Sequence, residues 1–271
     1  MSTTIAVIGA GNIGEALISG LVNSGVNPET ITATNRTEAR REELTQRYGV
    51  ITTDDNVEAV TDAEVCFLCV KPYAIAEMIE ELSDAIAAND TSTVLVSMAA
   101  GVTLDAMSEA VSSAGTPLAR VMPNTPMQVG KGVCVVSFGR FVEEDQRELV
   151  TDLLGATGEV VVVPEKLIDA ASAISGSGPA YFFMIAEALV DSAVSLGLPR
   201  ETATALATAT AEGAGAMLAH SGKTPVELRA GVSSPAGTTV AAIRELEESG
   251  VRGAFYRATE AAASRAGEIG K

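Results

Sequence analysis

The chain has 271 residues, of which 47% are apolar and 20% are charged, so it can bury a sizeable core without metals or disulfides. Its 35 acidic and 18 basic residues give a formal net charge of −17, which repels nucleic-acid phosphates and anionic lipid surfaces. We therefore expect neither nucleic acid nor a membrane as partner, and any anionic ligand needs a locally built site. The length predicts two domains.

No secretory or membrane segment is expected. The amino-terminal stretch lacks the basic residues that precede the apolar core of a signal peptide. The most apolar later stretch, residues 181–198, contains Glu187 and Asp191, which favours a buried helix over a membrane span. Three cysteines without framework spacing argue against a secreted disulfide scaffold. These features predict a soluble cytoplasmic protein.

Cys66 and Cys69 have the CxxC spacing of redox and zinc sites, but they lie in an apolar run that reads as a strand. Alternation along a strand sends positions i and i+3 to opposite faces of the sheet. We therefore expect no metal and no redox pair here.

The first 163 residues alternate short β-branched runs with helical patterns, which predicts βαβ units on a parallel sheet. The expected strands are residues 4–9, 30–34, 65–70, 93–97, 118–122, 132–138 and 159–163, and the helical patterns between them include residues 14–24 and 38–48.

Residues 164–271 carry helical patterns only, several with a proline at or just before the start. The expected helices are residues 166–174, 179–196, 200–220, 225–230, 236–249 and 251–269. Residues 181–186 are apolar on every face, and residues 202–216 are almost entirely Ala, Thr and Gly. Because such helices need burial on all sides, we infer that another subunit covers part of this half.

Gly9, Gly11 and Gly14 form a Gly-x-Gly-x-x-Gly motif that follows the first strand and opens a helix. The first glycine permits a tight turn, the second lets a pyrophosphate approach the backbone, and the third lets helix and strand pack closely. The helix amino terminus adds free N–H groups and partial positive charge. A glycine-rich turn without a ligand is the alternative, but the context favours a dinucleotide site in a Rossmann-like domain.

The end of the second strand indicates which dinucleotide binds. An NAD site usually has a carboxylate about 20 residues after the glycines, on the ribose 2′-hydroxyl. This chain instead has Asn35 and Arg36, whose amide and guanidinium suit the 2′-phosphate of NADPH. Arg40 and Arg41 either add positive charge to this site or form a solvated helix face, and the sequence leaves both open.

Five further stretches look unlike generic core: residues 70–72, 97–101, 120–126, 175–181 and 232–239. Together with residues 9–14 they resemble the pyrroline-5-carboxylate reductases, in order and over the whole length. The resemblance implies a Rossmann-like NAD(P)H-binding domain (1–163) followed by an all-α dimerisation and substrate domain (164–271). It also implies hydride transfer from NADPH, with NADH open as a second donor, to the ring C=N of 1-pyrroline-5-carboxylate. The product is L-proline, made in the last step of proline biosynthesis, and the family's homodimers often assemble further into decamers.

Carried over by residue, the family's cofactor contacts follow successive strands. They fall on Gly9, Gly11, Asn12, Ile13, Gly14, Asn35, Arg36, Asn56, Val70, Lys71, Pro72, Ala99, Ala100, Pro123 and Asn124. Ala99 and Ala100 match the turn beside the nicotinamide, where small side chains let the ring approach. Simple close packing is the alternative for both alanines.

The family's substrate residues fall on Ser233, Ser234, Gly237, Thr238 and Thr239. Thr239 matches the threonine that hydrogen-bonds the imine nitrogen, and is the catalytic candidate. The alternative is that these hydroxyls merely cap a helix. A cyclic imine can arrive protonated, so one hydroxyl suffices, and the single histidine, His220, is expected to be a helix-terminal residue.

The substrate loop departs from the family at two positions. Ala236 stands where the family usually has glycine, which predicts that this position avoids positive φ. Ala230 replaces an aspartate, which leaves the role of residues 228–231 open.

Two other functions compete with the reductase. Hydroxyacid and 6-phosphogluconate-type dehydrogenases place a lysine on the helix after a glycine-rich turn, but residues 175–179 lead into a helix without one. A non-catalytic NAD(P)-binding protein is the other alternative. The acidic excess, with 13 arginines against 5 lysines among the basic residues, predicts a halophilic protein that stays soluble in concentrated salt.

Overall fold

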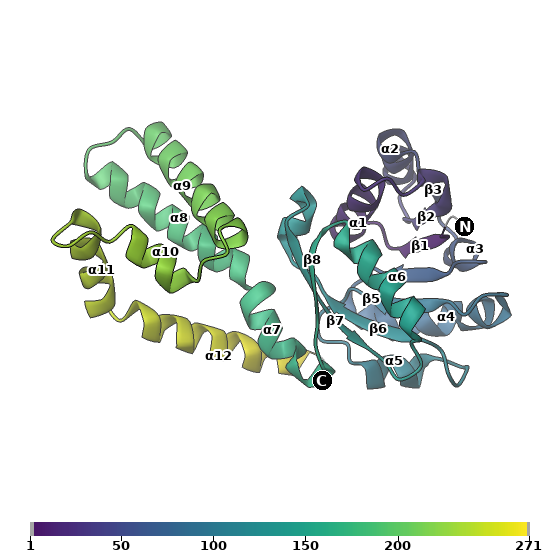
Figure 1. The fold of residues 1–271 in the computed structure, drawn as a ribbon. Helices are drawn as coiled ribbons and strands as arrows, with labels where there is room; N and C mark the ends of the chain where they lie inside the picture. The colour runs from purple at the N-terminus through teal and green to yellow at the C-terminus, as the bar shows by residue number, and fades with distance from the viewer. Residues whose placement is uncertain (1–2, 270–271) are drawn as a thin grey trace. The chain divides into compact units, whose positions relative to one another are not determined.

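The structure, a computed structural model, describes residues 3–269, which form two compact units (Figure 1). Unit 1 takes in the chain up to Ser177 and again from Ala262, and unit 2 is Gly178–Ala261.

Unit 1 is built on one eight-stranded sheet in the order β3-β2-β1-β4-β5-β6-β7-β8. The strands are β1 (Ile5–Ile8), β2 (Ile31–Thr34), β3 (Ile51–Thr53), β4 (Val65–Leu68), β5 (Val94–Ser97), β6 (Leu118–Met122), β7 (Gly132–Phe138) and β8 (Gly158–Val162). The seven expected strands are thus confirmed within two residues at each end.

The sheet departs from the prediction at two places. β6 and β7 pair antiparallel, so the expected wholly parallel sheet is wrong there. The connection from Met122 to Gly132 is too short for a parallel crossover, which needs about a dozen residues or more. The strand β3 was not predicted, because three residues at a sheet edge, with Ile51 half exposed, show no alternation.

In the described residues each of the two main cores of the sheet is built with three helices, and the alternation of the strands decides which residues face them. On one face lie α1 (Asn12–Asn23), α2 (Glu38–Tyr48) and α6 (Glu144–Gly155); on the other lie α3 (Asn56–Val60), α4 (Ile75–Ala88) and α5 (Leu104–Ala110). Val7 packs in the first core and Ile8 in the second.

The two cysteines of the CxxC spacing lie on opposite faces, as predicted. Cys66 belongs to one core and Cys69 packs against the other. Burial raises the pKa of the Cys66 thiol, and raises that of Cys69 to about 12, so both stay protonated at neutral pH. Among the described residues no group of His, Cys, Asp and Glu could hold a metal ion.

The helix α7 (Ile168–Ser175) belongs to unit 1 although it lies beyond the expected domain boundary at residues 163/164. The buried guanidinium of Arg120 on β6 pairs with Glu165 and Asp169, each at 3.2 Å. At the other end of the helix, Nδ2 of Asn124 donates to the carbonyl of Ser175 at 2.9 Å. The composition therefore changes at residue 164, whereas the compact units divide at residue 177.

Unit 2 consists of helices. They are α8 (Gly178–Ser195), α9 (Arg200–His220), α10 (Pro225–Gly231), α11 (Thr238–Glu248) and the first part of α12 (Val251–Ile269). Phe182 and Phe183 are each 65% exposed, and within the described part of this unit only Ala203 and Ala207 are buried apolar side chains. The unit therefore lacks a core of its own, as predicted from its apolar helices.

One helical stretch among residues 3–269, Glu165–Ser195, is long and apolar enough to cross a membrane by length and composition alone. Only 11% of its most apolar window is buried within the chain. A second protein surface or an apolar phase has to cover these side chains.

Candidate cofactor and substrate sites

The expected cofactor residues all follow strands that end at one edge of the sheet. The strands β1 to β6 are mutually parallel, so their carboxyl ends meet there. Gly9 follows β1, Asn35 and Arg36 follow β2, Asn56 begins the helix after β3, Val70–Pro72 follow β4, Ala99 and Ala100 follow β5, and Pro123 and Asn124 follow β6. The strand order reverses between β1 and β4, and open α/β sheets bind ligands at such a switch point.

The three glycines of the motif have three different environments. Gly9 has φ +84°, and a Cβ there would lie 2.7 Å from Cγ1 of Val70. A Cβ on Gly14 would lie 3.1 Å from the carbonyl of Gly9, so helix and strand meet too closely for a side chain. Around Gly11 no atom of the other described residues, apart from its two chain neighbours, lies within 4 Å of a Cβ position, which leaves open space beside its backbone. The geometry agrees with the turn and packing roles, and a pyrophosphate contact at Gly11 stays a prediction.

The amino terminus of α1 has no side-chain cap. Gly11 is its N-cap in extended conformation, and Asn12 and Ile13 form the start of the first turn. The first N–H groups of a helix lack partners inside the helix, and together with the helix dipole they attract anions. This terminus opens the helix directly after the glycine turn, where a pyrophosphate is expected.

Asn35 joins the turn after β2 to the glycine turn. Its Nδ2 donates to the carbonyl of Ala10 at 3.1 Å, and its Oδ1 accepts from the N–H of Thr37 at 3.0 Å. Arg36 is exposed, and within residues 3–269 its guanidinium makes no hydrogen bond or ion pair. Of the two residues expected to hold a 2′-phosphate, the Asn35 side chain is therefore fixed by hydrogen bonds to the protein. The Arg36 guanidinium is the charged group that stays available to a ligand.

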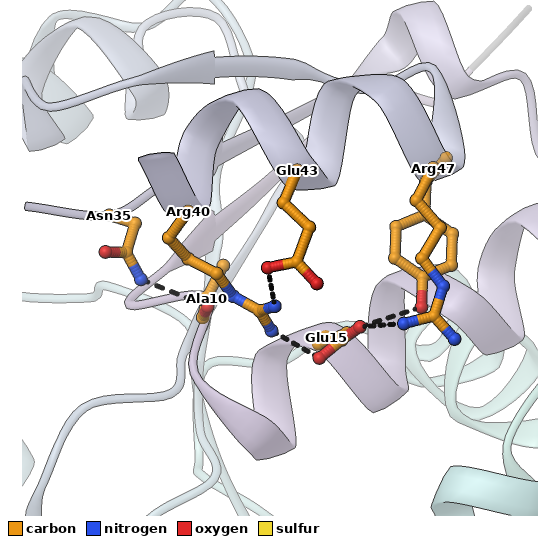
Figure 2. Close-up of polar contacts among 7 residues, drawn as sticks. Ala10, Glu15, Asn35, Arg40, Glu43 and Arg47 are labelled. Atoms are coloured by element: carbon orange, nitrogen blue, oxygen red, sulfur yellow. Dashed lines mark hydrogen bonds and ion pairs between the residues drawn. The ribbon is translucent and has the colours of Figure 1, made fainter. Parts of the chain in front are cut away.

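The structure gives Arg40 and Arg41 partners within the protein. Arg40 forms ion pairs with Glu15 and, at 2.7 Å, with Glu43 (Figure 2). Arg41 donates to the carbonyl of Asn35 at 2.8 Å. Both side chains are partly buried and bound to protein groups, so the solvated-face alternative is wrong, and their contribution of positive charge to the cofactor site stays a prediction.

Glu15, in the first turn of α1, is the residue that sequence reasoning missed. Its carboxylate also accepts from Arg47 at 2.8 Å (Figure 2). It accepts a further bond from the hydroxyl of Tyr48 at 3.0 Å. Partial burial raises its pKa, but the bonds from Arg40 and Tyr48 and the charges of Arg40 and Arg47 outweigh this, so the pKa lies below its usual value. Glu15 is therefore ionised at neutral pH.

The remaining residues expected to contact the cofactor differ in burial and in the hydrogen bonds that their side chains make. Nδ2 of Asn56 donates to Oε1 of Glu81 at 3.1 Å, and Lys71 is exposed. Ala99 is buried in one core of the sheet, as close packing requires, and Ala100 is half-buried.

The Asn124 side chain uses both of its polar atoms in hydrogen bonds to the backbone. Its Nδ2 donates to the carbonyl of Ser175, and its Oδ1 accepts from the N–H of Val133 at 2.8 Å. With its side chain buried and satisfied, Asn124 fixes the loop after β6, and beside it Pro123 is also buried.

The expected substrate residues lie in unit 2, in the loop between α10 and α11. Gly237 is the N-cap of α11, and no side chain caps this helix. The hydroxyl of Ser233 donates instead to the carbonyl of Arg229 at 2.6 Å. Thr238 and Thr239 begin α11, and within the described chain their hydroxyls make no hydrogen bond. The capping alternative is therefore wrong for α11, and its first turn is open to a ligand.

The prediction that Ala236 avoids positive φ is wrong, because its φ is +59°. The N–H of Gly237 donates to the carbonyl of Ser234 at 3.0 Å, which closes a tight turn. A Cβ on Gly237 would lie 2.6 Å from Oγ of Ser234, so this turn leaves no room for a side chain at residue 237. At the other departure, the carbonyl of Ala230 accepts from the N–H of Ser233 at 3.1 Å.

The fold and the carboxyl edge together define an NAD(P)-dependent α/β oxidoreductase with a helical second unit. Residues 4–101 match the family model described as NADP oxidoreductase, coenzyme F420-dependent. Residues 165–269 match the model for pyrroline-5-carboxylate reductase dimerisation. The chain is 57% identical over 269 residues to the pyrroline-5-carboxylate reductase of Corynebacterium melassecola, with 99% of each chain covered. The chain therefore belongs to the pyrroline-5-carboxylate reductase family, whose members are enzymes of proline biosynthesis.

Solved structures give the same result. The pyrroline-5-carboxylate reductase of Coxiella burnetii superposes with a TM-score of 0.95 at 37% identity, covering 100% of both chains. The Plasmodium falciparum pyrroline carboxylate reductase, solved with NADP bound, superposes with a TM-score of 0.85 at 26% identity, covering 99% of this chain and 98% of that one. The predicted fold, a Rossmann-like domain followed by a helical dimerisation domain, is confirmed.

The dimerisation match also accounts for the apolar surface of unit 2. It covers α8 and α9, whose apolar side chains are exposed in the single chain, and it implies a homodimer. A partner subunit, rather than a membrane, thus explains the apolar stretch Glu165–Ser195. Family membership also favours the reductase over the hydroxyacid dehydrogenase and non-catalytic alternatives.

Proposed function

We propose that this chain reduces 1-pyrroline-5-carboxylate to L-proline with NADPH as the preferred hydride donor. The observation that carries the cofactor preference is the end of β2, where Arg36 is exposed and uncommitted and a carboxylate is absent. A guanidinium pairs with the 2′-phosphate of NADPH, whereas NAD sites use a carboxylate on the ribose hydroxyl. NADH remains usable because the glycine turn and α1 contact the part common to both cofactors.

The proposed contacts divide between the two units. Bound NADPH would supply the hydride, and in unit 1 the open space at Gly11 and the uncapped start of α1 receive its pyrophosphate. Asn12, Ile13 and Gly14 then offer backbone N–H groups, and Val70–Pro72, Ala99 and Ala100 line the same edge.

In unit 2, the uncapped first turn of α11 supplies a carboxylate site without a charged side chain. Ser233, Ser234, Gly237 and Thr238 shape this site, and the hydroxyl of Thr239 donates to the imine nitrogen. A protonated cyclic imine needs only a hydride on carbon and a positioned nitrogen, so little acid–base machinery is required.

We also propose that dimers assemble further into decamers and that the enzyme is cytoplasmic. Both proposals are supported by membership in a family of proline-biosynthesis enzymes whose matched segment is a dimerisation domain. Light scattering on the purified protein tests the assembly; a species no larger than a dimer at every concentration would contradict the decamer.

The net charge of −17 supports a halophilic setting, because screening in concentrated salt reduces the self-repulsion of an acidic surface. We expect activity and thermal stability to rise from dilute buffer to molar KCl. Equal performance in both would refute this part of the proposal.

A substrate panel tests the reaction. The purified enzyme should oxidise NADPH with 1-pyrroline-5-carboxylate and form proline, and should be inactive with 3-hydroxyisobutyrate and 6-phosphogluconate when NADP⁺ is supplied. Oxidation of a hydroxyacid without turnover of the imine would favour the dehydrogenase alternative.

A further inference from the structure

Glu15 places a carboxylate in the first turn of α1, the helix expected to receive the pyrophosphate. Its side chain is 19% exposed and accepts from three donors: Arg40, Arg47 and Tyr48. An unpaired carboxylate here would repel an incoming anion, so these donors both fix the group and neutralise it.

Arg40 is held between two carboxylates. Its Nη2 pairs with Glu15 on α1 and its Nη1 pairs with Glu43 on its own helix. Figure 2 shows that Asn35 bonds to Ala10 in the glycine turn, whereas Arg40 bonds to Glu15 in the first turn of α1. Both arginines at the start of α2, near the proposed 2′-phosphate site, are thus bound to protein groups: Arg41 to the carbonyl of Asn35 and to Asp54, and Arg40 to two carboxylates that balance its charge.

We propose that Glu15 is a specificity-determining residue: by holding Arg40 against α1, it withholds this guanidinium from the 2′-phosphate and so limits the preference for NADPH over NADH. The inference rests on the proposed 2′-phosphate site at Arg36. In this arrangement Arg36 alone discriminates the two cofactors, and Arg40 is a cation that loss of Glu15 would release.

The contacts explain why Glu15, and not Glu43, controls Arg40. Glu15 belongs to a different helix and is less exposed than Glu43, whose side chain is 53% exposed and solvated. Arg47 and Tyr48 hold the Glu15 carboxylate in place from the far end of α2. Removing the Glu43 charge leaves Arg40 paired with Glu15 on α1. Removing the Glu15 charge breaks the ion pair that joins Arg40 on α2 to α1.

Binding of two nucleotides to variant enzymes tests the proposal. Calorimetry measures the affinity for adenosine 2′,5′-bisphosphate, which carries the 2′-phosphate, and for 5′-AMP, which lacks it. In Glu15→Gln we expect a gain of about three- to tenfold for the bisphosphate, which is less than a full charge-assisted bond gives because Glu43 still competes for Arg40, and a change within about twofold for 5′-AMP. The gain should disappear in the Glu15→Gln/Arg40→Ala double variant, and Glu43→Gln, which removes the same charge from the same arginine, should give less than half of it.

Arg40→Ala alone gives a second test that does not depend on Glu15→Gln folding. Because Arg47 still pairs with Glu15, a withheld Arg40 predicts at most about a twofold loss of bisphosphate affinity in this variant. A loss as large as in Arg36→Ala would show that Arg40 already binds the phosphate and would overturn the proposal. Equal gains for both nucleotides, equal effects of Glu15→Gln and Glu43→Gln, or a gain that survives Arg40→Ala would also overturn it. If Arg36→Ala lowers the affinity for both nucleotides equally, the proposed 2′-phosphate site at Arg36 is wrong. If Arg36→Ala lowers only the affinity for the bisphosphate and Glu15→Gln changes neither affinity, only the proposed role of Glu15 is wrong.

Discussion

Gly9 and Val70 meet where the strand order of the sheet reverses, with only 2.7 Å between Cγ1 of Val70 and the position that a Cβ on Gly9 would occupy. Gly9 also has φ +84°, which side chains rarely adopt. We therefore predict that Gly9→Ala both lowers the unfolding temperature and abolishes NADPH binding, because the turn and the end of β4 must move apart. Thermal unfolding and fluorescence titration with NADPH measure the two effects.

Gly11→Ala is the matched control for this prediction. Gly11 has φ −83°, and no atom lies within 4 Å of its Cβ position, so the variant should unfold at the wild-type temperature. Its methyl group would stand where the pyrophosphate approaches, and NADPH binding should weaken. Wild-type affinity in Gly11→Ala would place the pyrophosphate elsewhere.

Replacing Arg36 tests the cofactor preference in the working enzyme. Loss of a charge-assisted bond to a phosphate corresponds to about a 10- to 100-fold rise in the KM for NADPH, and the KM for NADH should change little. Arg36→Lys should fall between, because lysine keeps the charge but not the two-pronged geometry. Equal losses for both cofactors in steady-state kinetics would refute the assignment.

Thr239→Val removes the hydroxyl proposed to donate to the imine nitrogen while keeping the shape of the side chain. We predict that turnover falls about 100-fold, as when one positioned donor is lost, with NADPH affinity unchanged. Thr238→Val is the neighbouring control on the same turn of α11 and should mainly raise the KM for the imine. Wild-type turnover in Thr239→Val would remove this residue from the mechanism.

Ala236 holds a left-handed conformation that favours glycine. Ala236→Gly should therefore stabilise the protein by about 0.5–1 kcal/mol, and Ala236→Val, with its branched Cβ, should destabilise it. Thermal unfolding at one fixed protein concentration measures both changes. An unfolding temperature of Ala236→Gly at or below that of the wild type would contradict the strained turn.

The sequence predicts best those features that depend on local pattern. All strands of unit 1 except β3, and the helices of unit 2, follow from β-branched runs, helical periodicity and proline positions. The opposite faces of Cys66 and Cys69 follow from the two-residue repeat of a strand. The motif likewise predicts the turn at Gly9 and the close packing at Gly14. In the structure, a Cβ at either position would lie too close to a neighbouring atom.

Features that depend on contacts between distant segments could not be predicted in this way. The ion pair between Arg40 and Glu15 joins residues 25 positions apart, so the pattern of α2 alone could not separate a bound arginine from a solvated one. Arg120 had one signal, a charged residue inside an apolar strand, but its carboxylate partners lie beyond residue 163. The positive φ of Ala236 results from the closure of its turn, which residue preferences oppose.

Transfer of a label from the cofactor to the product tests the central claim most directly. NADPH carrying deuterium on the transferred position of nicotinamide C4 is incubated with the enzyme and 1-pyrroline-5-carboxylate, and the proline is examined by mass spectrometry and NMR. We predict one deuterium per proline, on the ring carbon that was doubly bonded to nitrogen and not on the carbon bearing the carboxylate. Unlabelled proline, or NADPH oxidation without proline, would contradict the account.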